Sequence, residues 1–598
     1  MEQLPIFNIR GEFMAALGRT NRIVLTAPTG SGKSTQAPQF LLDAPAGTLA
    51  AGQILVLQPR RLAARMLAER VADERAGKLG DEVGFQTRFE TAVSAQTRLR
   101  FITEGILPRM LLGDPLLRSV AAVVFDEFHE RSLATDLSLA LIRSLQETRR
   151  PDLKLVVMSA TLDAARLLEY LGNAPAPPAI GHLAAISPMT TDAMPGRNPI
   201  ATPSHRHTAV PVVHLHAEGR RYPVDIRYRQ GSGGAAQPWD LAADALGQLL
   251  AAGAAGDVLI FMPGSYEIRR TLEACRRHAG AGVTLLPLYG DLPAEQQHQV
   301  MRPDPVRRKI IVATNIAETS LTIPGVRHVI DSGLARIQRF DAARGFNTLF
   351  VETISRAAAE QRAGRAGREA PGICLRLWTQ LEQNHRPPHQ DAEIARVDLA
   401  ETVLSLSMLG FRPHEFPWFE SPPATAVAAA TTLLVDLGAL EKITNAERRV
   451  TNECDLKLDA DSAACAMRNS PFAIPHTVTP TGRRMSQLPA HPRLARLLLE
   501  AENRGCLREA TLLAAILSER NALLAGKTAD APAEDPYDSD LNRLMTLLHQ
   551  ARAAHYDPAH CTRLGLNATA ARQIFRTQAY FHQVCHRRGM VGEEPAGT

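Results

Sequence analysis

The stretch "RIVLTAPTGSGKSTQAPQF", residues 22–40, decides the fold of this chain. It opens with a short apolar run from Ile23 to Leu25, passes through a glycine-rich turn and continues in a helical pattern. Its core, APTGSGKST, matches GxxxxGK[ST] except that Ala27 replaces the first glycine. Glycines let backbone N–H groups converge on phosphate oxygens at a helix N-terminus, where the helix dipole also favours anions. The stretch therefore predicts a phosphate-binding loop between a strand and a helix.

Two side chains of this loop carry most of the expected chemistry. The Lys33 ammonium would reach the β- and γ-phosphates of a nucleotide, and the Ser34 hydroxyl would ligate Mg²⁺. The other loop residues expected to hold the nucleotide are Thr29, Gly30, Ser31, Gly32 and Thr35. The expected ligands are a nucleoside triphosphate and Mg²⁺.

A second stretch, "VVFDEFHERS" at residues 123–132, supplies the acidic groups that such a loop needs. Its first residues read as the end of a buried strand, and Asp126 and Glu127 follow directly. Asp126 would hold Mg²⁺ through its water shell, and Glu127, also near the metal, would orient and deprotonate the attacking water. An Asp-Glu pair alone also fits a solvated turn. Its position after the phosphate-binding loop, at the end of an apolar strand, favours the catalytic interpretation.

Composition places these motifs in a multidomain globular protein. The chain has 598 residues, enough for several domains, with 45% apolar and 22% charged residues. A formal net charge of +5 permits a polyanionic partner without demonstrating one. Seven cysteines are scattered without a CxxC pair, which favours a reducing cytoplasm over a disulfide framework or a zinc site. There is no signal-peptide pattern and no apolar run long enough to span a bilayer, so we expect no membrane partner.

Short β-rich runs separated by helical patterns recur in two blocks. The first block comprises IVLTAP, QILVLQP, AAVVFDE and KLVVMSAT, and the second, between residues 257 and 333, comprises DVLIFMP, TLLPLYG, KIIVATN and VRHVIDSG. This alternation predicts an α/β fold with two mostly parallel sheets. After residue 384 the patterns become helical, as in DLAETVLSLSMLG and LNRLMTLLHQARAA.

The phosphate-binding loop and DEFH together resemble motifs of the DEAH-box class of superfamily 2 helicases, and more closely its bacterial HrpB-type branch. Further motifs of that family match in order: QPRRLAAR (58–65), TEGIL (103–107), SAT (159–161), FMPGSYEI (261–268), ATNIAETSLTIPGV (313–326) and QRAGRAGR (361–368). One such match would be weak. Eight in order, over most of the first 370 residues, are specific.

The resemblance implies two tandem RecA-like lobes followed by a winged-helix domain and a helical ratchet-like domain. We expect the first lobe at residues 1–172, a flexible insertion at 173–212, the second lobe at 213–383, the winged helix at 384–490 with a loop insertion at 442–475, and the ratchet-like domain at 491–598. His205 and His207 in the first insertion have no cysteine or carboxylate at ligand spacing, so we expect a loop there rather than a metal site. Residues 335–350 lie where the family carries a strand-separating β-hairpin, and its alternation permits one. The oligonucleotide-binding barrel of many relatives is not evident.

The motif QRAGRAGR predicts cationic groups for the cleft between the lobes. Arg365 and Arg368 are three residues apart, on one helical face with Gln361 a further turn back. Their guanidiniums would meet the γ-phosphate of a nucleotide held by the other lobe, as arginine fingers. The interleaved glycines favour this over a solvated basic helix, because glycine weakens a helix and marks a close approach.

Five further residues of the nucleotide site are assigned by the resemblance alone. Ser159 and Thr161 would link hydrolysis to lobe movement, and His129 would bond across the same cleft. Arg70 and, in the second lobe, Leu334 would sandwich the nucleotide base. Neither Arg70 nor Leu334 offers hydrogen-bond readout of the base, so we expect weak discrimination among nucleotides.

The resemblance also implies nucleic-acid contacts at Arg60, Arg61, Thr103 and Thr314, along the tops of both lobes. Such contacts grip phosphates and sugars without reading bases, so binding should be sequence-tolerant and salt-sensitive. The alternative for the two arginines is a solvated turn after the strand ILVLQP.

These observations predict an ATP-dependent helicase or translocase that moves 3′ to 5′ on single-stranded or partly duplex RNA. Polarity and RNA come from the resemblance, and DNA stays open as a substrate. We expect a cytoplasmic monomer, and the sequence does not identify a protein activator. A P-loop kinase or GTPase is one alternative, but it has no place for QRAGRAGR in a second lobe. A non-catalytic ATP-driven scaffold is another, but such scaffolds often lose a residue among Lys33, Glu127 and Gln361, all of which are present.

Overall fold

The computed structural model describes residues 4–88, 90–160, 164–172, 211–219, 222–230, 236–280, 282–290, 292–318, 323–342, 345–442, 476–519, 522–524 and 539–590. These residues form two compact units. Unit 1 contains the described residues up to Asp398 together with Phe416–Pro423, and unit 2 contains Leu399–Glu415 and the described residues from Ala424 onward. Among the described helices, none combines the length and the apolar character needed to cross a bilayer.

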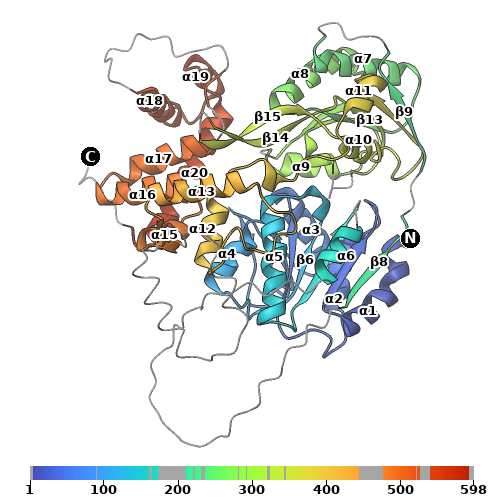
Figure 1. The fold of residues 1–598 in the computed structure, drawn as a ribbon. Helices are drawn as coiled ribbons and strands as arrows, with labels where there is room; N and C mark the ends of the chain where they lie inside the picture. The colour runs from blue at the N-terminus through green and yellow to red at the C-terminus, as the bar shows by residue number, and fades with distance from the viewer. Residues whose placement is uncertain are drawn as a thin grey trace, which may run out of the picture. The chain divides into compact units, whose positions relative to one another are not determined.

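The first sheet of unit 1 has eight strands in the order β4-β3-β5-β2-β6-β7-β1-β8. Two of them, β6 and β8, are labelled in Figure 1. Neighbouring strands are parallel except β3 and β4. The strands are β1 (Arg22–Thr26), β2 (Gln53–Gln58), β3 (Val83–Gln86), β4 (Thr91–Ala92), β5 (Leu99–Thr103), β6 (Val120–Phe125), β7 (Lys154–Ser159) and β8 (Val212–His216). The four predicted from sequence, β2, β6, β7 and β1, are confirmed and form the centre of the sheet. Central parallel strands are buried on both faces and read as continuous apolar runs, whereas the outer strands do not.

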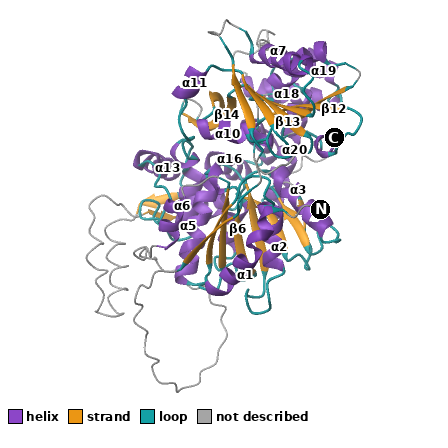
Figure 2. Cartoon of the chain, turned by 90° about the vertical axis from the view of Figure 1, so that its right-hand side faces the viewer, coloured by secondary structure: helices purple, strands orange, loops and turns teal. Residues whose placement is uncertain are grey.

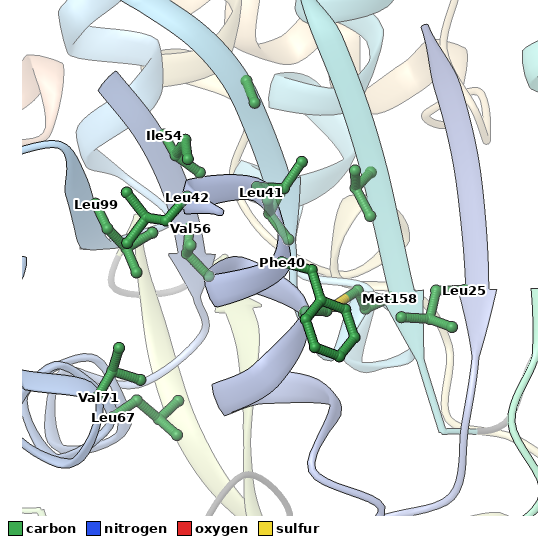
Figure 3. Close-up of a cluster of buried hydrophobic side chains, with 14 of the residues drawn as sticks. Leu25, Phe40, Leu41, Leu42, Ile54, Val56, Leu67, Val71, Leu99 and Met158 are labelled. Atoms are coloured by element: carbon green, nitrogen blue, oxygen red, sulfur yellow. The ribbon is translucent and has the colours of Figure 1, made fainter. Parts of the chain in front are cut away.

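Helices cover this sheet and complete the first lobe (Figure 2). They are α1 (Arg10–Arg19), α2 (Lys33–Leu42), α3 (Arg61–Glu74), α4 (Ile106–Gly113), α5 (Leu133–Thr148) and α6 (Ala164–Gly172), with 3-10 turns η1 (Pro5–Ile9) and η2 (Phe128–Glu130). Figure 3 shows part of the core, where Phe40 of α2 and Val71 of α3 join Val56 of β2 and Met158 of β7. This apolar layer holds the ends of α2 and α3 next to the strands that carry the polar motifs.

The second sheet of unit 1 has six parallel strands in the order β11-β12-β10-β13-β16-β9. Its strands are β9 (Val224–Tyr228), β10 (Asp257–Phe261), β11 (Val283–Leu288), β12 (Arg308–Ala313), β13 (Val326–Asp331) and β16 (Gly372–Arg376). Its helices are α7 (Pro238–Ala251), α8 (Ser265–Cys275), α9 (Ala294–Met301), α10 (Arg356–Ala363) and α11 (Gln380–His385), with 3-10 turns η3 (Arg276–His278), η4 (Asn315–Ala317) and η5 (Glu393–Ala395). Again the four predicted strands are confirmed, and they are neighbours. The expected pair of RecA-like lobes is therefore present.

A two-stranded hairpin stands between β13 and α10. Its strands β14 (Leu334–Asp341) and β15 (Phe346–Thr353) pair antiparallel, with Leu334 opposite Thr353 and Asp341 opposite Phe346. It covers the segment in which the sequence permitted a hairpin, apart from two residues of its turn that lie outside the described ranges.

Unit 2 is mainly helical. It contains α12 (Ala400–Met408), α13 (Ala424–Asp436), a small antiparallel pair β17 (Leu440–Lys442) and β18 (His476–Val478), then α15 (Pro480–Ser486), α16 (Pro492–Asn503), α17 (Leu507–Ser518), α18 (Asp540–Ala553), α19 (Pro558–Arg563) and α20 (Ala568–Arg587). The helices from α16 onward agree with the predicted ratchet-like domain, and the helices with the β17–β18 pair are the elements that a winged helix requires. Most of both predicted insertions, residues 173–210 and 443–475, lies outside the described residues, with His205 and His207.

Three segments cross the domain boundaries expected from the sequence. Strand β8 pairs with β1 in the first sheet, although residues from 213 onward were assigned to the second lobe. Of its five residues Leu215 alone is buried, as suits an edge strand, so no continuous apolar run marked it. Residues 384–398 belong to unit 1, as does Phe416–Pro423, which we call the return segment because the chain leaves unit 1 for α12 and comes back.

Candidate active site

The glycine-rich turn after β1 has the conformation expected of a phosphate-binding loop. Gly30 and Gly32 have φ of +89° and +92°, in the left-handed region that favours glycine. A Cβ at Gly32 would lie 2.9 Å from Leu4 Cδ1, so a side chain there would also have to displace the end of Leu4. The turn is supported from below by η1, because the Ile6 amide donates to the Ser31 carbonyl at 3.1 Å.

Lys33 and Glu127 form a buried ion pair at the centre of the site. The Lys33 Nζ lies 3.1 Å from Glu127 Oε1, and the two side chains are 3% and 1% exposed. Lys33 begins α2, directly after the turn, and Glu127 follows β6. The sequence predicted both residues for one site, and the structure brings them into contact.

Asp126 is held by the neighbouring strand. Its Oδ2 accepts from Gln58 Nε2 at 2.7 Å, and its Oδ1 accepts from the Glu127 amide at 2.9 Å. Ser34 lies near this carboxyl and lowers its pKa slightly. Gln58 ends β2, so the strand that leads to the predicted nucleic-acid residue Arg60 contacts the predicted metal ligand directly. Gln58 was not among the predicted site residues, although its place at the end of β2 puts it at the same edge of the sheet.

The pKa values of the two adjacent acids are shifted in opposite directions. Burial, with the neighbouring Glu127 charge, raises the pKa of Asp126 above its usual range. Burial would also raise the pKa of Glu127, but Lys33 outweighs it and holds that pKa low, so Glu127 is ionised. Burial lowers the pKa of His129 to about 4, which leaves its imidazole neutral at pH 7. Lys33 is therefore the cation that keeps Glu127 charged.

The loop that carries these groups is conformationally unusual. Glu127 and Arg131 flank the turn η2 with φ of +51° and +50°, in the left-handed region that non-glycine residues rarely adopt. His129 contacts the end of β7. Its Nδ1 accepts from the Ala160 amide at 3.5 Å and lies 3.4 Å from Ser159 Oγ. Thr161, also predicted for this site, lies outside the described residues.

The return segment holds the far side of this loop. Arg131 donates to both oxygens of buried Asp136, at 3.0 and 2.8 Å, and to Glu420 of the return segment at 2.9 Å. Its guanidinium also lies over the Phe419 ring, 4.5 Å from the centroid, and Phe128 meets that ring edge-on at 5.5 Å. Phe419 and Glu420 were not predicted, because nothing local in the sequence links them to a loop 289 residues away.

Ser132 connects the end of this loop to the motif TEGIL (103–107). Its hydroxyl caps α5 by accepting from the Thr135 amide at 3.1 Å, and it donates to the Glu104 carboxyl. Glu104 is 9% exposed, and burial raises its pKa to about 7. Thr103, predicted to contact nucleic acid, is the last residue of β5 and precedes this carboxyl.

The second lobe supplies the arginines of QRAGRAGR, though not from one helix. Helix α10 ends at Ala363, so Gln361 is helical whereas Arg365 and Arg368 lie on the turn that follows. The prediction of a shared helical face is thus wrong, because Gly364 and Gly367 end the helix. A Cβ at Gly367 would lie 2.5 Å from the Tyr222 carbonyl oxygen, which confirms that this glycine marks a close approach.

Arg365 approaches the catalytic acids from the second lobe. It is 4% exposed, its Nε donates to the Glu318 carbonyl at 2.9 Å, and it lies near enough to Glu127 to interact with that charge. Burial, followed by the neighbouring Arg368, lowers its pKa. Arg368 lines a cavity of about 760 Å³ together with Gly30 and Ser31 of the loop and Tyr222. The structure thus brings groups from both lobes to one place.

The predicted nucleic-acid residues lie at strand ends. Arg60 is two residues beyond β2 and Arg61 begins α3, where it is exposed; Thr314 follows β12 in the second lobe and is half-buried. Arg60 is half-buried and paired, unlike a residue of a fully solvated turn: its Nη2 lies 3.1 Å from Glu130 Oε2 and its Nη1 donates to the Ile316 carbonyl of the second lobe at 3.4 Å. Glu130 was not predicted.

The two residues expected to sandwich the base are on different lobes. Arg70 lies on α3, is 67% exposed and pairs with Glu74 Oε1 at 2.6 Å. Leu334 begins β14 and is half-buried, and its carbonyl accepts from Arg362 at 3.1 Å. Arg362 itself is a core group of the second lobe, paired with Glu318 at 3.0 Å and Asp331 at 2.9 Å.

The donor set suits a magnesium ion shared with a ligand. The described residues contain no group of three or more histidines, cysteines or acids placed to hold a metal by themselves. A hydroxyl at Ser34 beside the Asp126 carboxyl offers hard oxygen donors, and Mg²⁺ is commonly bound by one or two carboxylates plus substrate phosphates and water. The residues present therefore fit Mg²⁺ bound together with a triphosphate.

Three family models match this chain. They describe a DEAD/DEAH box helicase over residues 8–169, a helicase conserved C-terminal domain over 242–370, and a ratchet-like helicase associated domain (HA2) over 491–577.

Several known proteins are similar over most of its length. The ATP-dependent RNA helicase HrpB of Escherichia coli (strain K12) is 36% identical over 521 residues, which cover 87% of this chain and 55% of that protein. The probable ATP-dependent RNA helicase DHR2 of Saccharomyces cerevisiae is 35% identical over 537 residues, covering 88% of this chain and 63% of that protein. A crystal structure of the Escherichia coli DEAH/RHA helicase HrpB matches with a TM-score of 0.73 at 34% identity, over 99% of this chain and 61% of that one. This chain thus spans less than two thirds of each relative.

Proposed function

This chain belongs to the DEAD/DEAH box helicase family, and from that premise we propose that it is an ATP-dependent RNA helicase. It would couple Mg²⁺-ATP hydrolysis between its two RecA-like lobes to 3′-to-5′ movement along a single strand. The observation that carries the proposal is the convergence of Lys33, Asp126 and Glu127 from the first lobe with Arg365 from the second. These are the groups that phosphoryl transfer to water requires.

In the proposed reaction, Lys33 exchanges one anionic partner for another. Without nucleotide it neutralises Glu127. When Lys33 turns to the β- and γ-phosphates of the substrate, Glu127 loses the cation that holds its pKa low. A carboxylate with a higher pKa is a better proton acceptor, so Glu127 becomes an effective base only with substrate in place.

Ser34 and Asp126 would hold Mg²⁺, with Glu127 near its water shell. When bound, the ion would neutralise developing charge on the phosphates. Gln58 and the Glu127 amide, which both donate to Asp126, orient that carboxyl. The Lys33 side chain and the loop amides around Gly30 and Gly32 would orient the phosphates.

The second lobe would complete the site. Arg365 and Arg368 lie on a turn rather than a helix, and a turn anchored by a tight glycine contact gives both guanidiniums a defined position. As arginine fingers they would stabilise the charge on the transferred phosphoryl group. Because they belong to the other lobe, hydrolysis would depend on closure of the two lobes.

RNA is proposed as the polymer because the relatives carry that substrate in their names. Arg60, Arg61, Thr103 and Thr314 would contact its backbone. We further propose a monomer in a reducing cytoplasm, which agrees with free thiols at all five described cysteines. The 3′-to-5′ polarity rests on likeness to the DEAH-box family.

The proposal is tested by measuring ATP turnover with single-stranded RNA, with single-stranded DNA and without polymer, and then strand separation on RNA duplexes with a 3′ or a 5′ overhang. We expect RNA to stimulate turnover and only the 3′ overhang to support unwinding. Turnover that ignores RNA would overturn the helicase assignment. Equal unwinding from both overhangs would overturn the polarity alone.

A further inference from the structure

We propose that, in the RNA-free protein, the Glu130 carboxylate pairs with the Arg60 guanidinium at the position where an RNA phosphate would bind. RNA must then displace this carboxylate in order to bind Arg60. The inference rests on the proposed function and deepens it. It names the acid that competes with RNA at the nucleic-acid site and that connects this site to the loop of the catalytic acids. Glu130 acts here as a positioning residue and not as a catalytic one.

Arg60 contacts an acid of its own lobe and a carbonyl of the second lobe. Its Nη2 lies 3.1 Å from Glu130 Oε2, and its Nη1 donates to the Ile316 carbonyl of the second lobe at 3.4 Å. The side chains of Arg60 and Glu130 are 19% and 20% exposed, so water and ligands reach the pair. The pair is thus accessible to solvent and still in direct contact.

A carboxylate and a phosphate use the same N–H edge of a guanidinium. Both present two oxygens to parallel N–H donors, so they compete for one arginine. The site favours anions further, because Arg60 is the residue before α3 and no side chain caps that helix. Glu130 therefore supplies internally what an RNA backbone would supply from outside.

Displacing Glu130 would act on the loop that carries the catalytic acids. Glu130 ends the single turn η2, and its amide donates to the Glu127 carbonyl at 2.9 Å. The same loop is held at other points independently, by Arg131 on Asp136 and by His129 on Ser159. Losing the Arg60 contact should therefore leave the loop folded while removing one of its restraints.

The experiment measures the affinity of a fluorescein-labelled oligouridine by anisotropy, without nucleotide, and the RNA concentration that half-saturates ATP turnover. Wild type is compared with Glu130→Gln, Arg60→Gln and the double variant. We expect Glu130→Gln to bind about two- to fivefold more tightly, the range that partly exposed ion pairs contribute. The half-saturating RNA concentration should fall by the same factor while maximal turnover stays unchanged.

The double variant separates competition at Arg60 from general repulsion of RNA by a negative charge. If Glu130 competes for Arg60, Glu130→Gln has no effect once Arg60→Gln is present. Arg60→Gln alone should weaken binding and lower the salt dependence of log Kd by about 0.7, as the loss of one phosphate contact on a single strand does. Asp152→Asn, which removes a carboxylate 48% exposed in front of β7, at the opposite edge of the same sheet, is the matched control and should change neither quantity.

Three results would overturn the inference: no tightening in Glu130→Gln, an equal tightening in the Arg60→Gln background, or a fall in maximal turnover with unchanged RNA affinity, which would mean a structural role. Failure of the proposed function looks different. In that case wild type itself would neither bind the oligouridine nor respond to it.

Discussion

Two ion pairs of one loop, three residues apart, have the same length and different surroundings. Lys33–Glu127 and Arg60–Glu130 both measure 3.1 Å. The first is 3% and 1% exposed and the second 19% and 20%. In a dry site a charge left without its partner is costly, whereas near water it is solvated cheaply. The two pairs differ in burial and not in distance. We infer that the buried acid, Glu127, serves the chemistry, whereas the partly exposed acid, Glu130, can exchange its partner.

The strongest test of the buried pair is Glu127→Gln, which keeps the shape of the side chain and removes the base. We expect ATP turnover to fall by at least about 100-fold while ATP and RNA still bind. Lys33→Ala should instead weaken nucleotide binding itself, because it removes the cation that meets the phosphates. Single-turnover hydrolysis and equilibrium binding of a fluorescent nucleotide separate the two. Near-normal turnover in Glu127→Gln would show that another group is the base.

A second test removes a contact that supports the loop of both pairs, the packing of the return segment against it. Phe419 is 7% exposed and packs against Phe128 and Arg131, so Phe419→Ala leaves a cavity beneath the turn. We expect a loss of about 3 kcal/mol in the free energy of unfolding. Phe340→Ala is the control, since Phe340 on β14 is 41% exposed and its truncation should cost no more than about 0.5 kcal/mol. Equal losses in urea unfolding would mean that the Phe419 contact adds nothing to the loop.

Glu104 sharpens the comparison, because it is a buried carboxyl beside the same loop with hydroxyl partners, Ser132 and Thr135, and no cation among them. Burial raises its pKa from an ordinary 4.5 to about 7, so folding favours its neutral form. The folded protein then binds more protons than the unfolded chain between these values, and this contribution to stability, complete below pH 4.5, is lost as the pH rises through 7.

The substitution Glu104→Gln removes that titration. We expect the stability of the variant relative to wild type to increase from pH 5 to pH 8 by on the order of 2 kcal/mol. Urea unfolding at several pH values measures it, and Asp152→Asn should show no such trend over this range. A parallel pair of pH profiles for Glu104→Gln and wild type would mean that Glu104 is ionised in the folded protein.

The smallest effect concerns a third ion pair, Arg70–Glu74, whose side chains are 67% and 24% exposed. An exposed pair is weak, so Arg70 is available to stack on a nucleotide base. Stacking on a guanidinium, with Leu334 on the other side, does not distinguish bases. We expect GTP, CTP and UTP to support turnover within about tenfold of ATP, or about 1.4 kcal/mol. A strong preference for ATP in a four-nucleotide assay at saturating RNA would contradict this base site.

Much of the architecture could be predicted because its signals are local. The eight central strands are short apolar runs. Asp126 and Glu127 directly follow a strand, and Lys33 begins the helix after the turn that follows another, so parallel strands bring all three to one edge of the sheet. The partners of these residues could not be predicted in the same way. Glu130 lies 70 positions from Arg60 and Glu420 lies 289 from Arg131, and no periodicity connects such pairs. The prediction placed Arg365 and Arg368 on one helical face because of their spacing. It was wrong because Gly364 and Gly367 end the helix before both arginines.

The return segment makes the catalytic unit impossible to isolate by a single cut. A fragment ending at Asp398 contains every strand of both parallel sheets but lacks Phe419 and Glu420, which lie against the loop of the general base. Dissection at that natural-looking boundary would yield a protein whose low activity could be misread as dependence on the helical unit. A fragment intended to report on the lobes alone must therefore carry Phe416–Pro423, and the helix α12 that precedes it in the chain comes with it.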